Sequence, residues 1–340
     1  MNNKRQQDVV LLAHGSGGAM SHDLVEQRLF SFLRNSAPTT LDDAALLTGN
    51  HRIAFTTDSY VVSPLIFPGG DIGRLAVCGT VNDLAMMGAQ PLALSLALII
   101  EEGLPLQLLD TIAQSIHSAC TEAGVTIVTG DTKVVDRGKA DGLFINTSGI
   151  GAVPDGIAIS GSNACPGDRV LVSGALAEHG VAIMSAREGL TFTTNIISDC
   201  APLNSLVASM VTAGGIDLHC MRDPTRGGIA STLNELATQS GVTITVAEEA
   251  IPLQREVRSA CEMLGLDPLY VANEGKLVAV VASNAADRLL ATMRAHPLGR
   301  HAADIGEVTA SKPGRVTMKT ALGPERLIPM LAGELLPRIC

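Results

Sequence analysis

The chain has 340 residues and a mass of 35.2 kDa, which exceeds a typical single domain and suggests about two. Apolar residues make up 46%, aromatic residues 2%, and the formal net charge is −10, so an aliphatic core is expected and nucleic acid is an unfavourable partner. The most apolar stretch, Pro91–Ile100, is too short for a membrane helix, and the N-terminus lacks an export signal. We therefore expect a soluble, cytoplasmic protein that binds no membrane.

The first half of the chain alternates apolar runs, predicted as strands, with helical patterns. A short strand at 11–13 leads into the glycine cluster His14–Gly18 and a helical pattern at 21–33. The next predicted elements are strand 52–57, helix 70–88, strand 92–100, helix 106–123, strand 125–129 and strand 143–153. Glycine and proline punctuate residues 154–168, which predicts a domain boundary there.

The second half repeats the alternation of strands and helices. Its predicted elements are strand 169–173, helices 180–188, 201–213 and 226–239, strands 242–246 and 276–282, helix 285–296 and strand 302–308. Because the order lacks a regular strand–helix–strand repeat, we predict an α+β fold. It would comprise an N-terminal domain 1–155, a C-terminal α/β domain 156–310 and a C-terminal tail 311–340.

Seven cysteines are widely spaced along the chain. Without an export signal or a CxxC pair, neither a disulfide framework nor a structural zinc site is expected. We interpret six of them as small core residues. The seventh, Cys340, is the last residue, and a thiolate on a mobile tail would suit a covalent carrier. The alternative is a frayed end with an incidental cysteine.

The glycine cluster is a candidate phosphate loop. Gly15, Ser16, Gly17 and Gly18 lie between a predicted strand and a predicted helix, where backbone N–H groups can bind phosphate. The cluster matches neither the Walker nor the dinucleotide pattern, so a flexible turn is an equal alternative.

Acidic residues recur at strand ends or in apolar surroundings. Because Mg²⁺ prefers oxygen ligands, a convergence of such residues would bind a magnesium nucleotide, although each alone could be a cap or turn residue. Asn82 and Asp83 lie inside an apolar helix and need partners. Lys133 and Lys276 are candidate phosphate or substrate contacts. The acidic candidates are Asp42, Asp43, Asp58, Asp83, Asp131 and Asp223.

These motifs, taken in order, resemble the HypE family of hydrogenase maturation proteins, from about residue 10 to the last residue. The matching segments are His14–Gly18, Thr57–Ser59, Pro68–Gly73, Gly79–Asp83, Thr129–Lys133, Asp223–Gly228, Asn273–Lys276 and Pro337–Cys340. One departure is Ala177–Gly180, where the family pattern has Gly-Asp-His-Gly. The resemblance implies the two-domain fold of the aminoimidazole ribonucleotide synthetase superfamily, and a homodimer whose N-terminal strands form a shared barrel.

The resemblance also implies an activity, an ATP-dependent carbamoyl dehydratase. A partner carbamoyltransferase would load Cys340, and ATP with Mg²⁺ would convert the S-carboxamide into a thiocyanate. The cyanide would pass to iron-scaffold maturation proteins and then to nickel–iron hydrogenase. Glu274 would remove the carboxamide proton and Lys133 would stabilise charge. Asp43, Asp58, Asp83 and Asp223 would bind Mg²⁺, while Asn82, Asp131 and the Gly15–Gly18 loop would contact the nucleotide.

Two other functions stay open at this point. A kinase or synthetase of the same superfamily would act on a free small molecule, as selenophosphate synthetase or thiamine monophosphate kinase does. The first would carry a cysteine near the glycine loop, and the second would need no terminal cysteine. A third reading is a non-catalytic scaffold whose Cys340 anchors a partner or a metal.

Overall fold

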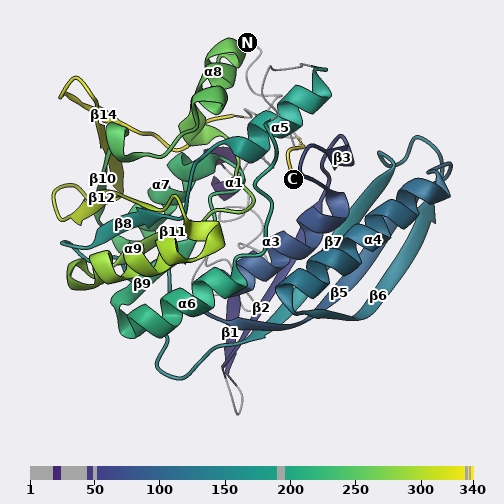
Figure 1. The fold of residues 1–340 in the computed structure, drawn as a ribbon, viewed down its shortest axis with the longest axis horizontal. Helices are drawn as coiled ribbons and strands as arrows, with labels where there is room; N and C mark the ends of the chain where they lie inside the picture. The colour runs from purple at the N-terminus through teal and green to yellow at the C-terminus, as the bar shows by residue number, and fades with distance from the viewer. Residues whose placement is uncertain (1–17, 24–43, 49–51, 190–195, 334–335, 337) are drawn as a thin grey trace, which may run out of the picture.

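The computed structural model describes residues 18–23, 44–48, 52–189, 196–333, 336 and 338–340. Figure 1 shows two units side by side, each combining a sheet with helices, which confirms the α+β prediction. The expected strand 11–13, most of the helix 21–33, Gly15–Gly17 and Asp43 lie outside the described residues. Within the described part, no helix is both long and apolar enough to cross a bilayer.

The N-terminal unit is built on a five-stranded sheet of order β1-β2-β7-β5-β6. β5 pairs in parallel with β6, and the other neighbours are antiparallel. A separate hairpin, β3–β4, precedes the helix α3. The elements are α1 (Ala19–Asp23), β1 (Ala45–Thr48), β2 (Arg52–Tyr60), β3 (Ile66–Phe67), β4 (Gly70–Asp71), α3 (Ile72–Met86), β5 (Gln90–Glu101), α4 (Leu106–Ala123), β6 (Thr126–Val135) and β7 (Leu143–Ala152).

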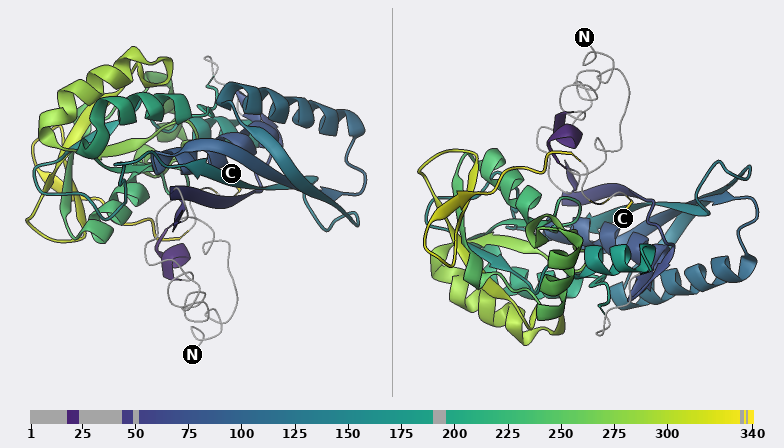
Figure 2. Two further views of the ribbon diagram at one scale, coloured as in Figure 1. Left: turned by 90° about the horizontal axis from the view of Figure 1, so that it is seen from below. Right: turned by 90° about the horizontal axis from the view of Figure 1, so that it is seen from above.

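Helices α3 and α4 cover one face of this sheet (Figure 2). α3 is apolar on nearly all sides, which is typical of a helix enclosed by protein, and it packs against β2, β7, α4 and α6. Asp71 caps it by accepting hydrogen bonds from the backbone N–H groups of Gly73 and Arg74. α4 buries only one stripe, which includes Ile112 and Ile116, because its other side faces solvent.

The C-terminal unit contains a seven-stranded sheet of order β14-β13-β10-β12-β8-β11-β9. Its helices lie around this sheet, as Figure 1 shows. The elements are β8 (Arg169–Val172), α5 (Glu178–Arg187), α6 (Asn204–Gly214), β9 (Leu218–Arg222), α7 (Gly228–Ser240), β10 (Thr243–Ala247), α8 (Arg255–Leu264), β11 (Val278–Val281), α9 (Ala286–Ala295), β12 (Ala303–Thr309), β13 (Arg315–Lys319) and β14 (Glu325–Leu327).

A continuous apolar core joins the two units. Leu84 and Met86 at the end of α3 belong to one buried cluster with Leu206 and Met210 of α6 and Leu289 of α9. Helix α3 is therefore packed between the N-terminal sheet and the helices of the second unit. This arrangement fixes the residues of α3 relative to the loops of the C-terminal unit.

The predicted tail begins later than residue 311. β13 pairs in parallel with β10, and β14 pairs with β13, so residues through Leu327 belong to the C-terminal sheet. The turn at 311–314, where the tail was predicted to start, connects β12 and β13. Val316 and Met318 are buried by alternation along β13. The segment that leaves the sheet starts after Leu327.

Two other local predictions need correction. β6 continues to Val135, so the segment Gly130–Lys133 lies within a strand and not after one. Cys165 is exposed, because it sits in a surface turn, whereas the other five cysteines assigned to the core are buried. Helix α8 and strand β9, which precedes Asp223, were absent from the predicted elements.

Candidate active site

A pocket between the two units brings together residues from five separated parts of the chain. β2, α3, the loop after β9, the segment before β11 and the last residue all contribute to its lining. The lining residues are Asp58, Ser59, Tyr60, Gly79, Asp83, Asp223, Thr225, Arg226, Glu274 and Cys340. The structure therefore gathers three of the predicted magnesium ligands, the predicted base and the predicted carrier thiol at one place.

The loop after β9 is shaped by its close approach to the chain before Glu274. Gly228 has a φ of 60°, and a Cβ there would overlap the carbonyls of Leu269 and Val271. Asn273 continues this contact, because its side-chain amide donates to the Pro224 carbonyl at 2.9 Å. The two segments thus hold Arg226 and Glu274 on the same pocket wall.

On α3, the adjacent residues Asn82 and Asp83 have different partners. Asp83 Oδ2 accepts a hydrogen bond from Thr56 Oγ1 at 2.7 Å and reaches the pocket. Asn82 is buried, donates to the carbonyls of Ala201 and Glu274 at 3.2 Å each, and accepts from Leu203 N at 2.7 Å. Its amide groups are committed to the backbone, so within this chain Asn82 fastens α3 to the second unit.

The charged side chains of the pocket shift one another's pKa values. Burial raises the pKa of Glu274 well above its ordinary value, Asp223, Asp199 and Asp58 raise it further, and Arg226 opposes them. Burial likewise raises the pKa of Asp58, again against Arg226. One buried oxygen of Glu274, Oε1, has no hydrogen-bond partner among the described residues. Because several carboxylates are buried together, binding of a further cation here would be favourable.

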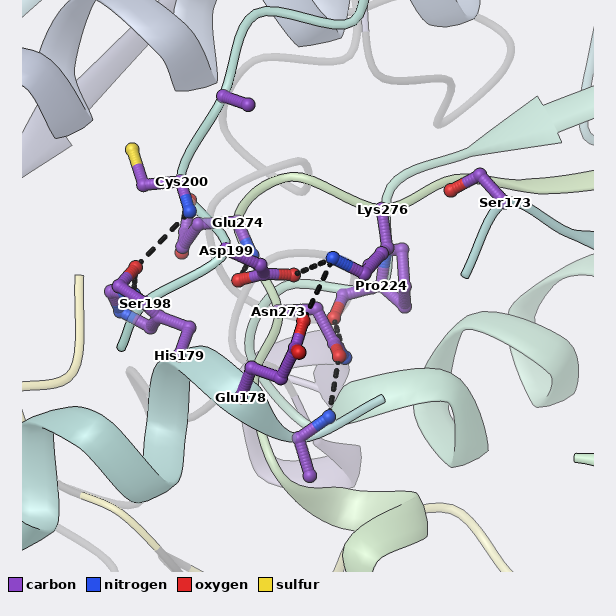
Figure 3. A network of polar contacts seen from close by, with 12 residues as sticks. Ser173, Glu178, His179, Ser198, Asp199, Cys200, Pro224, Asn273, Glu274 and Lys276 are labelled. Atoms are coloured by element: carbon purple, nitrogen blue, oxygen red, sulfur yellow. Dashed lines mark hydrogen bonds and ion pairs between the residues drawn. The ribbon is translucent and has the colours of Figure 1, made fainter. Parts of the chain in front are cut away.

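Behind the pocket lies a polar network, shown in Figure 3. Lys276 Nζ pairs with Glu178 Oε2 at 3.0 Å and with Asp199 Oδ2 at 3.1 Å. Asp199 Oδ1 in turn accepts from the backbone N–H of Glu274 at 3.1 Å. Burial lowers the pKa of Lys276, but Asp199 and Glu178 outweigh it and raise that pKa overall. Lys276 therefore supports the segment that bears Glu274, and it does not line the pocket.

The C-terminal residues dock into the pocket through their main chain. Ser63 N and Arg187 Nη2 donate to the Arg338 carbonyl, at 3.3 and 2.9 Å, and Val61 N donates to Cys340 O at 3.3 Å. Ile339 is buried in the core beside α3. Burial raises the pKa of the Cys340 thiol, Arg226 lowers it, and Glu274 and Asp58 raise it further.

The remaining predicted residues lie elsewhere. Asp131 and Lys133 pair with each other at 2.8 Å on β6, and both side chains are largely exposed. Strand register places them on the sheet face opposite α3, beside Ala97 and Ile99. Gly18 is buried against Leu331, whose carbonyl accepts from Ala19 N at 2.9 Å. The roles predicted for Asp43 and Gly15–Gly17 concern residues outside the described part.

Sequence reasoning did not select several residues that the structure places at or behind the pocket, among them Arg226, Tyr60 and Asp199. Arg226 and Tyr60 line it, and Asp199 holds the backbone of Glu274. Arg226 and Tyr60 were within reach of sequence reasoning, because Arg226 belongs to the Asp223–Gly228 motif and Tyr60 follows Asp58 at alternate spacing on β2. Nothing in the sequence around Asp199 pointed to its role.

A second group of ligand-type side chains lies away from this pocket. Cys165, Asp168 and His219 have potential ligand atoms within 4.8 Å of one another. Asp168 Oδ2 already accepts from Cys165 N and contacts His219 Nδ1, both at 2.7 Å. These contacts close the surface turn before β8, and a structural role accounts for them.

Comparison with known proteins agrees with this architecture. The family model for the N-terminal domain of AIR synthase related proteins matches residues 41–153, and the model for the C-terminal domain matches residues 165–319. A protein of Rhizobium leguminosarum bv. viciae named carbamoyl dehydratase HypE is 55% identical over 342 residues, covering 99% of this chain and 98% of that one. The Escherichia coli protein of the same name is 44% identical over 337 residues, covering 97% and 99%.

Solved structures give the same result. A HypE–HypF complex contains a chain with a TM-score of 0.87 and 50% identity, covering 91% of this chain and 99% of that one. A HypE structure in complex with ATP has a TM-score of 0.83 and 49% identity, covering 98% and 100%. Thiamine monophosphate kinase of Aquifex aeolicus, at 16% identity and a TM-score of 0.65, shares the fold alone.

The fold and the interdomain pocket thus define an enzyme of the AIR synthase related class. Within this class, the chain belongs to the HypE family of carbamoyl dehydratases.

Proposed function

We propose that this enzyme dehydrates a carbamoyl group carried on its own Cys340, using ATP, and so produces an S-bound cyanide for nickel–iron hydrogenase maturation. The observation that carries this proposal is the position of Cys340, the last residue, in one pocket with Asp58, Asp83, Asp223 and Glu274. A covalent carrier docked beside its own catalytic groups makes the reaction intramolecular and excludes water.

In the proposed reaction, the γ-phosphoryl group of ATP is transferred to the oxygen of the S-carboxamide. The carbon–oxygen bond then breaks, with phosphate as the leaving group, and the nitrogen loses both of its protons. The carbon and nitrogen remain on sulfur as a thiocyanate. Glu274 would take one of these protons, and two observations support this role: its carboxylate faces Cys340, and burial makes it a stronger base than an exposed carboxylate.

The pocket fits a magnesium nucleotide by its donor set. Asp58, Asp83 and Asp223 offer hard oxygen ligands, and burial raises the pKa of Asp58 despite the opposing charge of Arg226. Mg²⁺, when bound, supplies positive charge that neutralises the phosphate oxygens. Arg226 contributes a fixed positive charge at the same wall. The ATP complex of a close structural relative supports the assignment of the nucleotide.

Partners follow from the same proposal. Cys340 must be loaded by a carbamoyltransferase, and the HypE–HypF complex supports a partner of that kind. Iron-scaffold maturation proteins would accept the cyanide. We also propose a homodimer, because Phe55 on β2 and Ile150 on β7 are paired on the sheet face opposite α3 and each is 40% exposed. A second copy would cover these side chains.

The test uses intact mass measurement of the C-terminal peptide after incubation with carbamoyltransferase, carbamoyl phosphate and ATP. We expect wild-type protein to gain the mass of a cyano group in place of one hydrogen on Cys340. Cys340→Ala should bind ATP normally and gain nothing, while Cys165→Ala, which changes an exposed cysteine elsewhere, should behave as wild type. Glu274→Gln should accumulate the carbamoyl form, because the base is missing.

Other results would replace the proposal. A cyano group on Cys340→Ala protein would exclude Cys340 as the carrier, and dehydration by Glu274→Gln at the wild-type rate would exclude Glu274 as the base. Phosphorylation of thiamine phosphate, independent of Cys340, would favour a kinase. Absence of magnesium–ATP binding in calorimetry would favour a scaffold.

A further inference from the structure

The turn that departs from the family pattern, Ala177–Gly180, lies directly beside the docked C-terminus. Ala177 adopts a left-handed φ of 72°, and its N–H donates to Asn273 Oδ1 at 2.8 Å. Gly180 N donates to the Ala272 carbonyl at 3.1 Å, and a Cβ on Gly180 would overlap Val271. The turn is therefore fixed against the segment that leads to Glu274, and it orients the side chain of His179.

The His179 ring is fully buried and uses both nitrogens. Nε2 lies 2.8 Å from the Ile339 carbonyl oxygen, and Nδ1 lies 2.8 Å from Ser198 Oγ. The ring also packs edge-on against Phe67, with ring centroids 5.6 Å apart. Every hydrogen-bonding group of this side chain is thus committed, and one of the two bonds reaches the residue next to Cys340.

Hydrogen-bonding chemistry determines the tautomer. A carbonyl oxygen only accepts, so Nε2 must carry the hydrogen that is donated to Ile339. Burial lowers the pKa of His179, which favours the neutral ring, and Nδ1 then accepts from the Ser198 hydroxyl. Ser198 Oγ itself accepts from the backbone N–H of Cys200 at 3.1 Å. Ser198 therefore fixes the ring form that can bind the tail.

The same short segment supports both the tail and the base. Ser198 orients His179, while its neighbour Asp199 accepts from the backbone N–H of Glu274 at 3.1 Å (Figure 3). We propose that His179 is a positioning residue of this enzyme. By donating from Nε2 to the Ile339 carbonyl, it holds the docked tail so that the Cys340 sulfur faces Glu274.

This assignment rests on the proposed carrier role of Cys340, and it adds a specific consequence. The tail must leave the pocket for loading and return for dehydration. Loss of the His179 contact weakens only the docked position, so loading of Cys340 should be as fast as in wild type or faster, whereas dehydration of the loaded group should slow. A merely structural defect would impair both steps.

The experiment measures how fast Cys340 is alkylated by iodoacetamide in the full-length chain, with the exposed Cys165 as internal reference. This readout requires no turnover. His179→Phe preserves a planar ring without a donor, and we expect Cys340 to react about tenfold faster, the usual worth of one buried hydrogen bond. His179→Gln, which retains a donor, should fall between the two. His117→Phe, at an exposed position of α4, is the matched control and should match wild type.

Ser198→Ala keeps the imidazole ring and removes only the hydroxyl that selects its tautomer. This variant therefore tests the positioning role even if His179→Phe is too unstable to interpret. We expect faster alkylation there too, by a smaller factor. Wild-type alkylation rates in Ser198→Ala and in a stably folded His179→Phe would overturn the assignment. Failure of the proposed function is distinct, because then wild-type Cys340 would never gain a cyano group, whatever the alkylation rates.

Discussion

At the residue scale, the proposed function depends on a carboxylate whose pKa is raised by its surroundings. Burial and the nearby Asp223, Asp199 and Asp58 raise the pKa of Glu274, and Arg226 lowers it. A base must be ionised to accept a proton. The dehydration rate should therefore increase with pH through the range where Glu274 loses its proton, which lies above that of an ordinary carboxylate.

Arg226→Gln tests this balance. The positive charge of Arg226 lowers the pKa of Glu274, so its removal should raise that pKa. The rising limb of the pH–rate profile should then move to higher pH. Arg226→Lys keeps the charge and should move it less. Single-turnover dehydration of carbamoyl-loaded protein across pH is the measurement. An unshifted profile in Arg226→Gln would show that Glu274 is not the titrating base.

At the element scale, α3 both lines the pocket and connects the two units. It presents Asp83 to the pocket, and Asn82 ties it to backbone groups of the second unit. Its start is defined by one side chain, because Asp71 Oδ1 accepts from Gly73 N at 2.8 Å and from Arg74 N at 3.0 Å. The stability of this helix therefore limits how firmly the pocket is held.

Asp71→Ala should lower the free energy of unfolding by about 1 kcal/mol, the usual cost of losing an N-cap side chain. Urea denaturation followed by circular dichroism measures this change. Asp110→Ala, on the exposed side of α4, removes the same carboxylate without a cap and should have little effect. Equal stability of the two variants would contradict the capping role.

At the scale of the whole molecule, the described part of one chain does not bring Lys133 and Asp131 to the pocket. Lys133 and Asp131 lie on the sheet face opposite α3, whereas Asp58 and Cys340 belong to the pocket. If Lys133 stabilises the reacting oxygen, it must do so from a second copy of the chain. The exposed apolar residues Phe55 and Ile150 on that same face give a second copy a surface to cover.

Mixed dimers test this arrangement. Lys133→Ala and Cys340→Ala should each be inactive alone. When they are unfolded together and refolded as a mixture, activity should return, because a mixed dimer combines Cys340 of one chain with Lys133 of the other. Dehydration assays on the mixture measure it, and each variant refolded by itself is the control. An inactive mixture that contains mixed dimers would show that Lys133 acts within its own chain or not at all.

Much of the fold was predictable where a hydrophobic pattern within one segment defines a helix or strand. The predicted elements between 52 and 123 were found because β2 and α4 each bury one regular face and α3 is a long apolar run. The role of Asn82 was not, because its partners Ala201, Leu203 and Glu274 are distant in sequence. The extent of β6 and the strands β13 and β14 also escaped, because exposed or short strands carry weak periodic signals.

The sequence by itself determined which residues form the site: the acidic residues, Glu274 and a terminal cysteine. They could be identified because they lie in ordered motifs with defined residue types and spacing. Only the tertiary structure decided their arrangement. It placed Cys340 in the pocket, joined Ser198 and His179 to the carbonyl beside Cys340, and left Lys133 on another face. Contacts between segments more than 100 residues apart depend on packing, which no local pattern encodes.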